Sequence, residues 1–352
     1  MSHLTTTGRP VKGSNERNTI HSNSGEFMSK NVVRLLAIAI AGFSLVVGTA
    51  AYAAVPAGKK FDLTASLVKP ALLDAKALKH PTVMQSFAYD PYNNDLYTMQ
   101  VMSGESAEGN LVVTKNPRSG NPDYMVLNGF GHGATMGLQK NSSTSGVYLW
   151  VESHSVENSK GDGNGTRIAR VKWSNKARPG VNNPLVTDLT PPNAVGHTPR
   201  PVVDQKNGLL VVRTTSGHTY TFTAYTLTDA AAKVWTKPVY TTTVPQMKVP
   251  GSSTDYMVSQ GTTAFGNYVY LYWGENYDKA PAGNTYLQSY KIVNGKAATL
   301  EQSKHTEAYK SLDFREPEGI NVYKSRSSAP VLAFGFASGK SGARKATIAG
   351  KP

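Results

Sequence analysis

The sequence predicts an all-β fold: a five-bladed β-propeller, built as a single domain behind a signal peptide. The first observation is the composition, which has 17% charged residues, 32 Gly and 20 Pro, and more Tyr (18) than Phe (10). Such a mixture is typical of many short strands joined by turns, and it disfavours a helical bundle. The second observation is a unit of three short strands that recurs five times, with starts about 50 to 65 residues apart.

Each unit has a first strand, a turn, a second apolar strand, a variable loop and a third strand. The first unit reads QSFAYD-PYNN-DLYTMQVM and then GNLVVTKN. One small sheet cannot bury both of its faces, so repeated meanders favour stacking of blade on blade around an axis. A β-sandwich of irregular hairpins is the alternative. The expected blades cover residues 84–116, 131–173, 199–227, 258–292 and 315–350 of a propeller spanning 84–352.

Little of the chain has a helical pattern. Residues 71–79 (ALLDAKALK) are expected to form two helical turns before Pro81, and residues 229–234 one more. Residues 54–83 as a whole are expected to be a lead-in segment, or an outer strand that helps to close the ring.

The first 53 residues are expected to lie outside the fold. Residues 1–27 are polar and aperiodic, which indicates a disordered leader or a mis-assigned start. Residues 28–53 combine basic Lys30 and Arg34, a short apolar run at 35–47 and an Ala-Tyr-Ala site at 51–53, the pattern of a secretory signal peptide. A membrane anchor is the alternative, but the run is shorter than the roughly 20 residues of a membrane span. The expected protein is bacterial, secreted or cell-wall associated, with no stable membrane insertion after cleavage.

The charge points to anionic partners. The chain has 37 basic and 23 acidic residues and a net charge of +14. Residues 1–53 carry five basic and two acidic residues, so their removal leaves +11. An exported basic protein meets phosphate-rich wall polymers and uronate polysaccharides; no nucleic-acid motif is present. Alternatively, the basic charge serves only to keep the protein soluble.

Candidate binding residues lie where the first strand of each unit begins, because in a propeller these positions converge on one mouth of the central channel. His132 stands between two glycines, which let the backbone approach a ligand and expose the imidazole. Bonding of this imidazole to neighbouring loops is the alternative. The five starts supply Gln85, His132, Arg200, Gln260 and the pair Glu316 and Glu318.

Further candidates flank these starts. Arg315 could bind a phosphate or carboxylate with two donors. The alternative is an internal ion pair of Arg315 or Arg200 with Glu316 or Glu318, which would close the last blade against its neighbours. The second strands of units two and four end in an aromatic residue and a carboxylate two positions on, with both side chains on one face of the strand. These pairs could bind sugar, although a Trp there is also expected in the inter-blade core. They are Trp150 with Glu152 and Trp273 with Glu275, and Arg213 holds the matching position in unit three.

An ordered series of motifs resembles a known family. The series is GFGHGATMGL at 129–138, YLWVES at 148–153, GTRIARVKW at 165–173, REPEGINVY at 315–323 and LAFGFASGKSGARKATI at 332–348. It resembles exported proteins of the teichoic acid biosynthesis protein C and helveticin J-like family, and the propeller of staphylococcal-phage receptor-binding proteins. The resemblance covers about 84–348. It implies a β-propeller that engages cell-wall glycopolymer, and it implies no catalytic set.

Enzyme signals are weak. The absence of Cys excludes a disulfide framework, a thiolate zinc site and a Cys nucleophile. No G-x-S-x-G, HExxH or phosphate-loop motif occurs, the histidines are scattered, and the DGNG sequence at 162–165 is expected to be a turn rather than a calcium loop. No cofactor or metal is therefore expected.

The sequence thus favours a binding protein, whose basic, aromatic mouth takes a teichoic-acid-like polymer. The alternatives are a polysaccharide lyase or glycosidase acting at the same mouth, a bacteriocin-like antagonist, and a scaffold that docks another protein.

Overall fold

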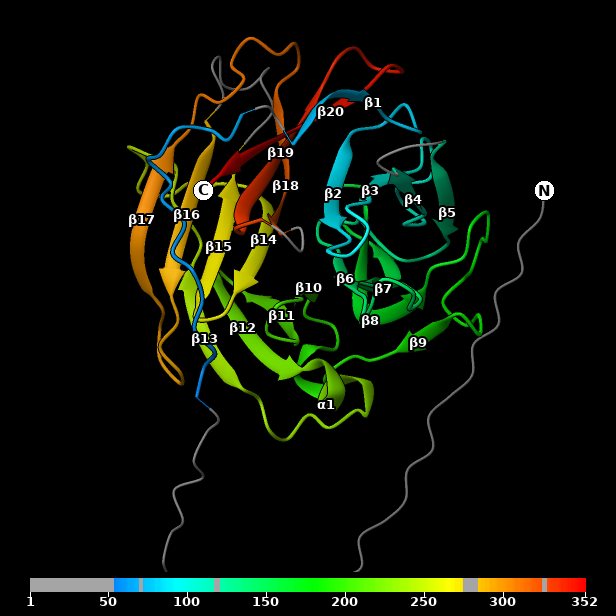
Figure 1. Ribbon diagram of the computed structural model, residues 1–352, viewed down its shortest axis with the longest axis horizontal. Coiled ribbons are helices and arrows are strands. Elements are labelled where there is room, and N and C mark those ends of the chain that lie inside the picture. Colours follow the sequence, from blue (N-terminus) through cyan, green and yellow to red (C-terminus); the bar gives the residue numbers. More distant parts are fainter. Residues whose placement is uncertain (1–53, 70–71, 117–120, 275–283, 325–327) are drawn as a thin grey trace, which may run out of the picture. The chain divides into compact units, whose positions relative to one another are not determined.

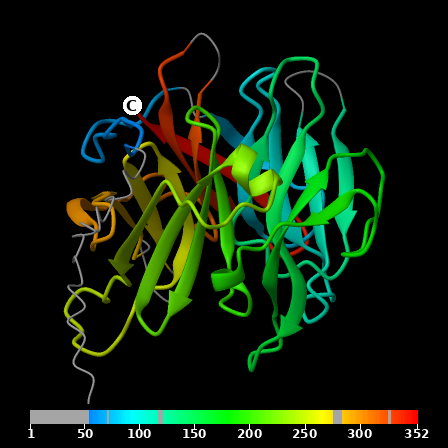
Figure 2. The ribbon, with the colours of Figure 1, turned by 90° about the horizontal axis from the view of Figure 1, so that it is seen from below.

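The computed structural model describes residues 54–69, 72–116, 121–274, 284–324 and 328–352. Within them, twenty strands form five antiparallel sheets of four strands each. The sheets surround a central axis as five blades (Figure 1), and a view turned by 90° shows them standing side by side (Figure 2). The five-bladed propeller is confirmed, and the β-sandwich is excluded.

The innermost strand of each blade contacts its counterparts in neighbouring blades, as the contacts of β14 with β18, β18 with β2, β2 with β6, β6 with β10 and β10 with β14 show. These strands are β2 (Met84–Tyr89), β6 (Gly137–Gln139), β10 (Arg200–Asp204), β14 (Ser259–Phe265) and β18 (Glu316–Tyr323). The second strands are β3 (Leu96–Val101), β7 (Tyr148–Glu157), β11 (Leu209–Ser216), β15 (Tyr268–Trp273) and β19 (Val331–Ser338). The third strands are β4 (Leu111–Asn116), β8 (Gly163–Lys172), β12 (Thr219–Thr226), β16 (Tyr286–Lys291) and β20 (Lys345–Lys351).

A fourth, outer strand completes every blade, where the sequence pattern predicted only three strands. The outer strands are β5 (Asp123–Leu127), β9 (Val186–Asp188), β13 (Tyr240–Pro245), β17 (Thr299–His305) and β1 (Leu73–Ala77). Three of them, β1, β9 and β17, have no buried residue. An edge strand of this kind needs no apolar alternation, so the pattern did not reveal it.

The helix predicted at 71–79 is wrong, because this segment contains β1, which pairs antiparallel with β20. The pairing register shifts between Leu73 and Lys76, and Ala75 takes a positive φ of 42° there. Helical propensity is a weak preference that pairing with an open sheet edge overrides. The last blade therefore takes its outer strand from the N-terminal side of the propeller, which closes the ring; Figure 1 shows β1 beside β20.

The second predicted helical turn lies close to a helix, α1 (Leu227–Ala231). It begins two residues before the predicted start, because the Thr226 side chain caps it by accepting from the Asp229 N–H. A short 3-10 helix, η1 (Pro192–Ala194), lies between β9 and β10.

The core lies between blades. One cluster joins strands of blades one and two, for example Met99 and Leu111 with Leu149 and Val171. The lead-in also contributes, because Phe61 and Leu63 are fully buried beside Tyr270. The blades thus form a single packed ring, which holds the inner strands at fixed positions around the axis.

Candidate functional site

Side chains from the second and third blades meet at the mouth where the inner strands begin. We name Arg200, Arg213, Glu152 and His132 the arginine cluster. Arg200 and Arg213 are direct partners in the β10–β11 ladder, so their side chains emerge on one face of the sheet. Both arginines are buried, at 6% and 7% exposure.

Each arginine has different partners. The Arg200 guanidinium forms an ion pair with Glu152, and its Nη2 donates to Asn164 Oδ1 at 2.8 Å. Arg213 Nη1 donates to Ser259 Oγ at 2.8 Å, and its guanidinium carbon lies 4.5 Å from the centroid of the Tyr220 ring. Among the described residues Arg213 has no ion pair, and its buried Nε has no hydrogen-bond partner. Glu152 therefore pairs with Arg200, whereas the neighbouring Arg213 is buried without a carboxylate partner in the described part of the chain.

The electrostatic cost of this arrangement is visible in the pKa values. Burial, and then the charge of Arg213, lower the pKa of Arg200 to about 9. Burial also lowers the pKa of Arg213. Both shifts mean that the charged forms are poorly solvated, so an anion reaching this mouth would stabilise them.

Glu152 braces the GHG motif. Its Oε1 accepts from the Gly133 N–H at 2.5 Å, and its Oε2 accepts from the Gly165 N–H at 2.8 Å. Gly131 has a φ of 136°, and a Cβ there would lie 2.5 Å from the Gly165 nitrogen and 2.7 Å from the Glu152 carboxyl carbon. The glycines are thus explained by close approach of the backbone to this carboxylate.

His132 is half-buried within the braced loop. Burial, followed by the charge of Arg200, lowers its pKa, and only Asp162 opposes the shift. The imidazole is therefore neutral at neutral pH and can accept a proton or a hydrogen bond beside the arginines.

Two of the other predicted residues lie at the starts of inner strands. Gln85 is 8% exposed, and Gln260 is half-buried and donates from Nε2 to the Gly274 carbonyl at 3.2 Å. Ser259, adjacent to Gln260, receives the Arg213 hydrogen bond, which connects the fourth blade to the arginine cluster.

Arg315 packs elsewhere, between the fourth and fifth blades. It is fully buried, with all three nitrogens donating: Nε to Ala308 O at 2.7 Å, Nη2 to Thr306 O at 3.0 Å and Nη1 to Thr285 Oγ1 at 3.0 Å. Its guanidinium also lies 4.3 Å from the Phe336 ring centroid. These contacts are structural, and the ion pair considered for it is not among those found between described residues.

Glu318 is 4% exposed, whereas Glu316 is half-buried. Burial, and then the charge of Glu316, raise the pKa of Glu318 well above its usual value. The carboxyl group therefore keeps its proton in the folded protein over a pH range in which the unfolded chain loses it.

Glu318→Gln is expected to stabilise the protein increasingly as the pH rises above about 4.5. Above the unfolded pKa the wild type loses up to about 1.4 kcal/mol per pH unit until the raised folded pKa is reached, because only the unfolded state releases the proton. Gln cannot ionise and avoids this loss. Urea unfolding of both proteins at pH 4, 6 and 8 measures it, with exposed Glu157→Gln as the control. An equal stability difference at all three pH values would contradict the assignment.

Both tryptophans of the predicted Trp–carboxylate pairs, and Glu152, belong to the interior. Trp150 and Trp273 are fully buried, and their indole N–H groups donate to Gln139 at 3.0 Å and Gln288 at 2.9 Å. Contact with a sugar would require these rings to become exposed. Glu275 lies outside the described residues.

A cavity of about 370 Å³ opens at the other mouth of the channel, where the inner strands end. All five inner strands line it, with Tyr89, Leu138, Val203, Phe265 and Val322 as one residue from each. Predictions from strand starts alone could not find this mouth. The aromatic and basic residues in the turns that follow the inner strands, Tyr92, Lys206 and Lys324, could have indicated it.

The described residues include neither a metal-binding cluster nor a membrane-spanning helix. Across the described ranges, no group of three or more His, Asp or Glu side chains is arranged to hold a metal ion. In that same portion of the chain, no helix has the length and apolar character needed to cross a bilayer.

Comparison with known proteins decides the family. Residues 83–350 match the model described as the phage 5-bladed beta propeller receptor binding platform domain. The chain belongs to this family. The chain is 28% identical over 298 residues to "Putative major teichoic acid biosynthesis protein C" of Bacillus subtilis (strain 168), a match covering 82% of this chain and 63% of that protein.

The platform domain also resembles a solved tail fiber of Staphylococcus aureus phage P68, with a TM-score of 0.59 and 18% identity. That match covers 81% of this chain and 52% of the tail fiber. The chain thus spans about half to two thirds of the length of these two proteins. The resemblance drawn from the sequence motifs is confirmed, and the tail fiber supports the fold alone.

Proposed function

We propose that this platform domain binds an anionic cell-wall glycopolymer of the teichoic-acid type at the arginine cluster. The observation that carries the proposal is the pair of adjacent buried guanidinium groups, of which Arg200 pairs with Glu152 while Arg213 has no ion pair among the described residues. A phosphate oxygen would supply the missing anion and accept the free N–H of Arg213.

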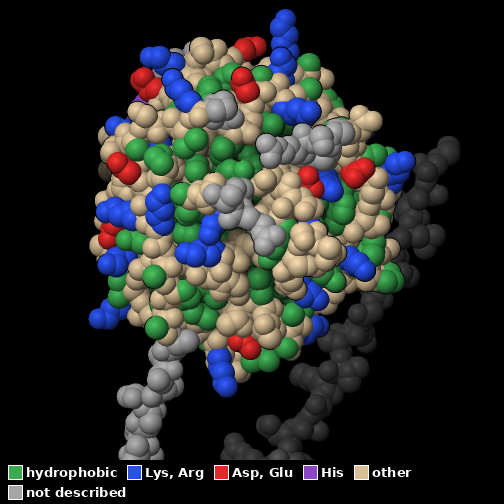
Figure 3. Space-filling model, in the orientation of Figure 1, with side chains coloured by type: hydrophobic (Ala, Val, Ile, Leu, Met, Phe, Trp, Pro, Cys, Tyr) green, Lys and Arg blue, Asp and Glu red, His purple; other side chains and the backbone are tan. Residues whose placement is uncertain are grey.

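Other features support the same ligand class. The family is described as receptor-binding, and the Bacillus relative is named for teichoic acid. The net charge of +14 attracts polyanions over distance, although basic side chains are spread over the face in Figure 3 rather than gathered in one patch. Specific binding must therefore come from a local site. His132 and Gln260 would contact sugar or polyol hydroxyls next to the arginines.

Secretion is part of the proposal, on the signal-peptide pattern at 28–53. Outside the cell the protein would meet wall polymers directly, and wall remodelling or attachment of an antagonistic, bacteriocin-like protein to a competitor would both use such binding.

The test is a pull-down with purified cell walls. Arg213→Met is expected to weaken binding by roughly tenfold or more, because a hydrogen bond to a charged group contributes about 1.5–3 kcal/mol. Lys291→Met, which removes one exposed charge on β16, is the matched control. Binding should also fall with added salt, since the attraction is electrostatic. Equal binding to walls stripped of teichoic acid would refute the ligand, and an unaffected Arg213→Met would refute the site.

A polysaccharide lyase is the second candidate, favoured by the neutral state of His132 beside Arg200. In β-elimination an arginine neutralises the uronate carboxylate while a neutral base removes the α-proton. A lyase would release unsaturated uronate, seen as ultraviolet absorbance, and His132→Ala would abolish this signal. If none of a panel of uronate polymers gives an absorbance change, the lyase is refuted and binding remains as the proposed function.

A further inference from the structure

The cavity at the second mouth has the features of a small-molecule site. Its volume of about 370 Å³ lies near the lower end of the range of about 300–1,000 Å³ for such sites. One sugar ring with a substituent fits this size. Since all five blades contribute, the cavity is a product of the ring as a whole.

The walls offer an aromatic surface and unengaged polar groups. Tyr92 and Phe265 line the cavity, with Lys206 Nζ 5.2 Å from the Phe265 ring centroid. In the part of the chain that the structure describes, neither Lys206 nor Lys324 has an ion pair, and the half-buried Asn321 side chain makes no hydrogen bond. Three sets of donors therefore remain available at this mouth.

Among the described residues that line the cavity, Asp204 supplies the carboxylate, and this group is already engaged. Asp204 Oδ2 accepts from the Gly266 N–H at 2.6 Å and from Asn207 Nδ2 at 2.6 Å, and Oδ1 accepts from the Asn207 N–H at 3.2 Å. It forms no ion pair with a lysine in the described ranges. The cavity therefore has two lysines without a counter-ion at its rim, and a ligand with a negative charge would complete it.

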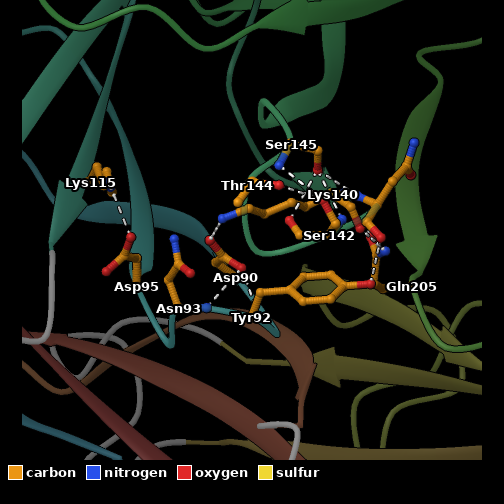
Figure 4. A network of polar contacts seen from close by, with 11 residues as sticks. Asp90, Tyr92, Asn93, Asp95, Lys115, Lys140, Ser142, Thr144, Ser145 and Gln205 are labelled. Atoms are coloured by element: carbon orange, nitrogen blue, oxygen red, sulfur yellow. Dashed lines mark hydrogen bonds and ion pairs between the residues drawn. The ribbon is translucent and has the colours of Figure 1, made fainter.

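The lining is held in place before any ligand arrives. Figure 4 shows the network beside the cavity. Asp90 Oδ1 accepts from the Tyr92 N–H at 2.8 Å, and the Tyr92 hydroxyl donates to the Asn141 carbonyl at 2.8 Å, so this ring is fixed at both ends. Gln205 exchanges two hydrogen bonds with the Lys140 backbone, at 3.2 and 2.6 Å. Such preorganisation lowers the entropic cost of binding.

We propose that this cavity binds a single sugar ring carrying an anionic substituent, a glycosyl phosphate or a uronate. The ring lies against Tyr92 and Phe265, the Asn321 amide bonds a hydroxyl, and Lys206 and Lys324 hold the anion. The proposal is independent of the polymer function, because it concerns the opposite mouth and a monomeric ligand.

Calorimetric titration of the purified protein with glucose 1-phosphate, glucuronate, glucose and inorganic phosphate tests the proposal. Glucose 1-phosphate, glucuronate or both are expected to bind at least fivefold more tightly than glucose and inorganic phosphate; which of them binds better identifies the source of the anion. The double variant Lys206→Met/Lys324→Met, which changes exposed or half-exposed side chains, is expected to lose this preference while its melting temperature stays unchanged.

Lys172→Met/Lys291→Met removes the same two charges from exposed strand positions and should bind like the wild type. Three results would overturn the proposal: no binding of any of the four probes, equal binding of glucose and its phosphate, or loss of binding in Arg213→Met but not in the double lysine variant. Wall binding that survives in the double lysine variant separates this site from the arginine cluster.

Discussion

Glu152→Gln is expected to lower the free energy of unfolding by about 3–5 kcal/mol, the usual effect of removing one partner of a buried ion pair. Glu152 is fully buried and forms the ion pair with Arg200, which lies beside the buried Arg213. A neutral amide would leave two buried like charges side by side. It would also place an –NH₂ group, which cannot accept, against one of the two glycine N–H groups that the carboxylate now binds. Urea unfolding followed by fluorescence measures the loss.

The companion variants separate charge from packing. Glu152→Gln combined with Arg200→Met removes both members of the ion pair and should recover part of the lost stability. Exposed Glu157→Gln, on the same strand, controls for loss of an acidic group. A Glu152→Gln protein as stable as the wild type would show that Glu152 does not balance the charge of Arg200.

Polyphosphate should raise the melting temperature of the wild type, since a ligand that binds only the folded state raises its stability. It should raise the melting temperature of Arg213→Met less, and an equal rise in both proteins would contradict binding at Arg213.

The sequence was sufficient to predict the propeller because its inner and middle strands carry the apolar runs. Two glycines of the motif at 129–138 are explained by close contacts, because a Cβ at Gly131 would clash with Glu152 and a Cβ at Gly137 would clash with Val203. Four outer strands were missed. β9 and β17 are exposed edges that need no apolar pattern, whereas β5 and β13 do bury residues and were not assigned to a blade. The fifth, β1, lies within 54–83, where an outer strand that closes the ring was one of the two expectations. Its residues were also predicted to be helical, and pairing with β20, more than 260 residues away along the chain, overrides that propensity.

The site could be predicted only in part. The position of Arg200 follows from the rule that strand starts converge on one mouth, because β10 begins at this residue. His132 was also predicted at a strand start, but it lies in the loop before β6, which begins only at Gly137. Whether an arginine faces the mouth or a neighbouring blade depends on packing partners that sequence spacing does not specify, as Arg315 shows. The fully buried Trp150 and Trp273 illustrate the same limit, because alternation places a ring on a face of the strand without saying what covers that face. The cavity at the opposite mouth required the assembled ring.

Lys140→Met is expected to destabilise the protein by about 3–5 kcal/mol, because it leaves Asp90 buried without its counter-ion. The Lys140 Nζ and Asp90 Oδ2 atoms are 2.7 Å apart, and the two side chains are 3% and 0% exposed. This pair joins the first blade to the second, and the Lys140 backbone is bonded to Gln205 of the third. Differential scanning calorimetry at neutral pH measures the change.

The control is Lys310→Met, which breaks an exposed ion pair with Glu307 and should change the stability by about 0–1 kcal/mol. Asp90→Asn/Lys140→Met replaces both charges and should be more stable than Lys140→Met alone, since no unpaired charge remains buried. If the single and double variants melt at the same temperature, the loss comes from packing rather than from the unpaired carboxylate.

Because Asp90 also fixes the Tyr92 backbone, a protein that has lost this ion pair should bind glucose 1-phosphate more weakly even at temperatures where it remains folded.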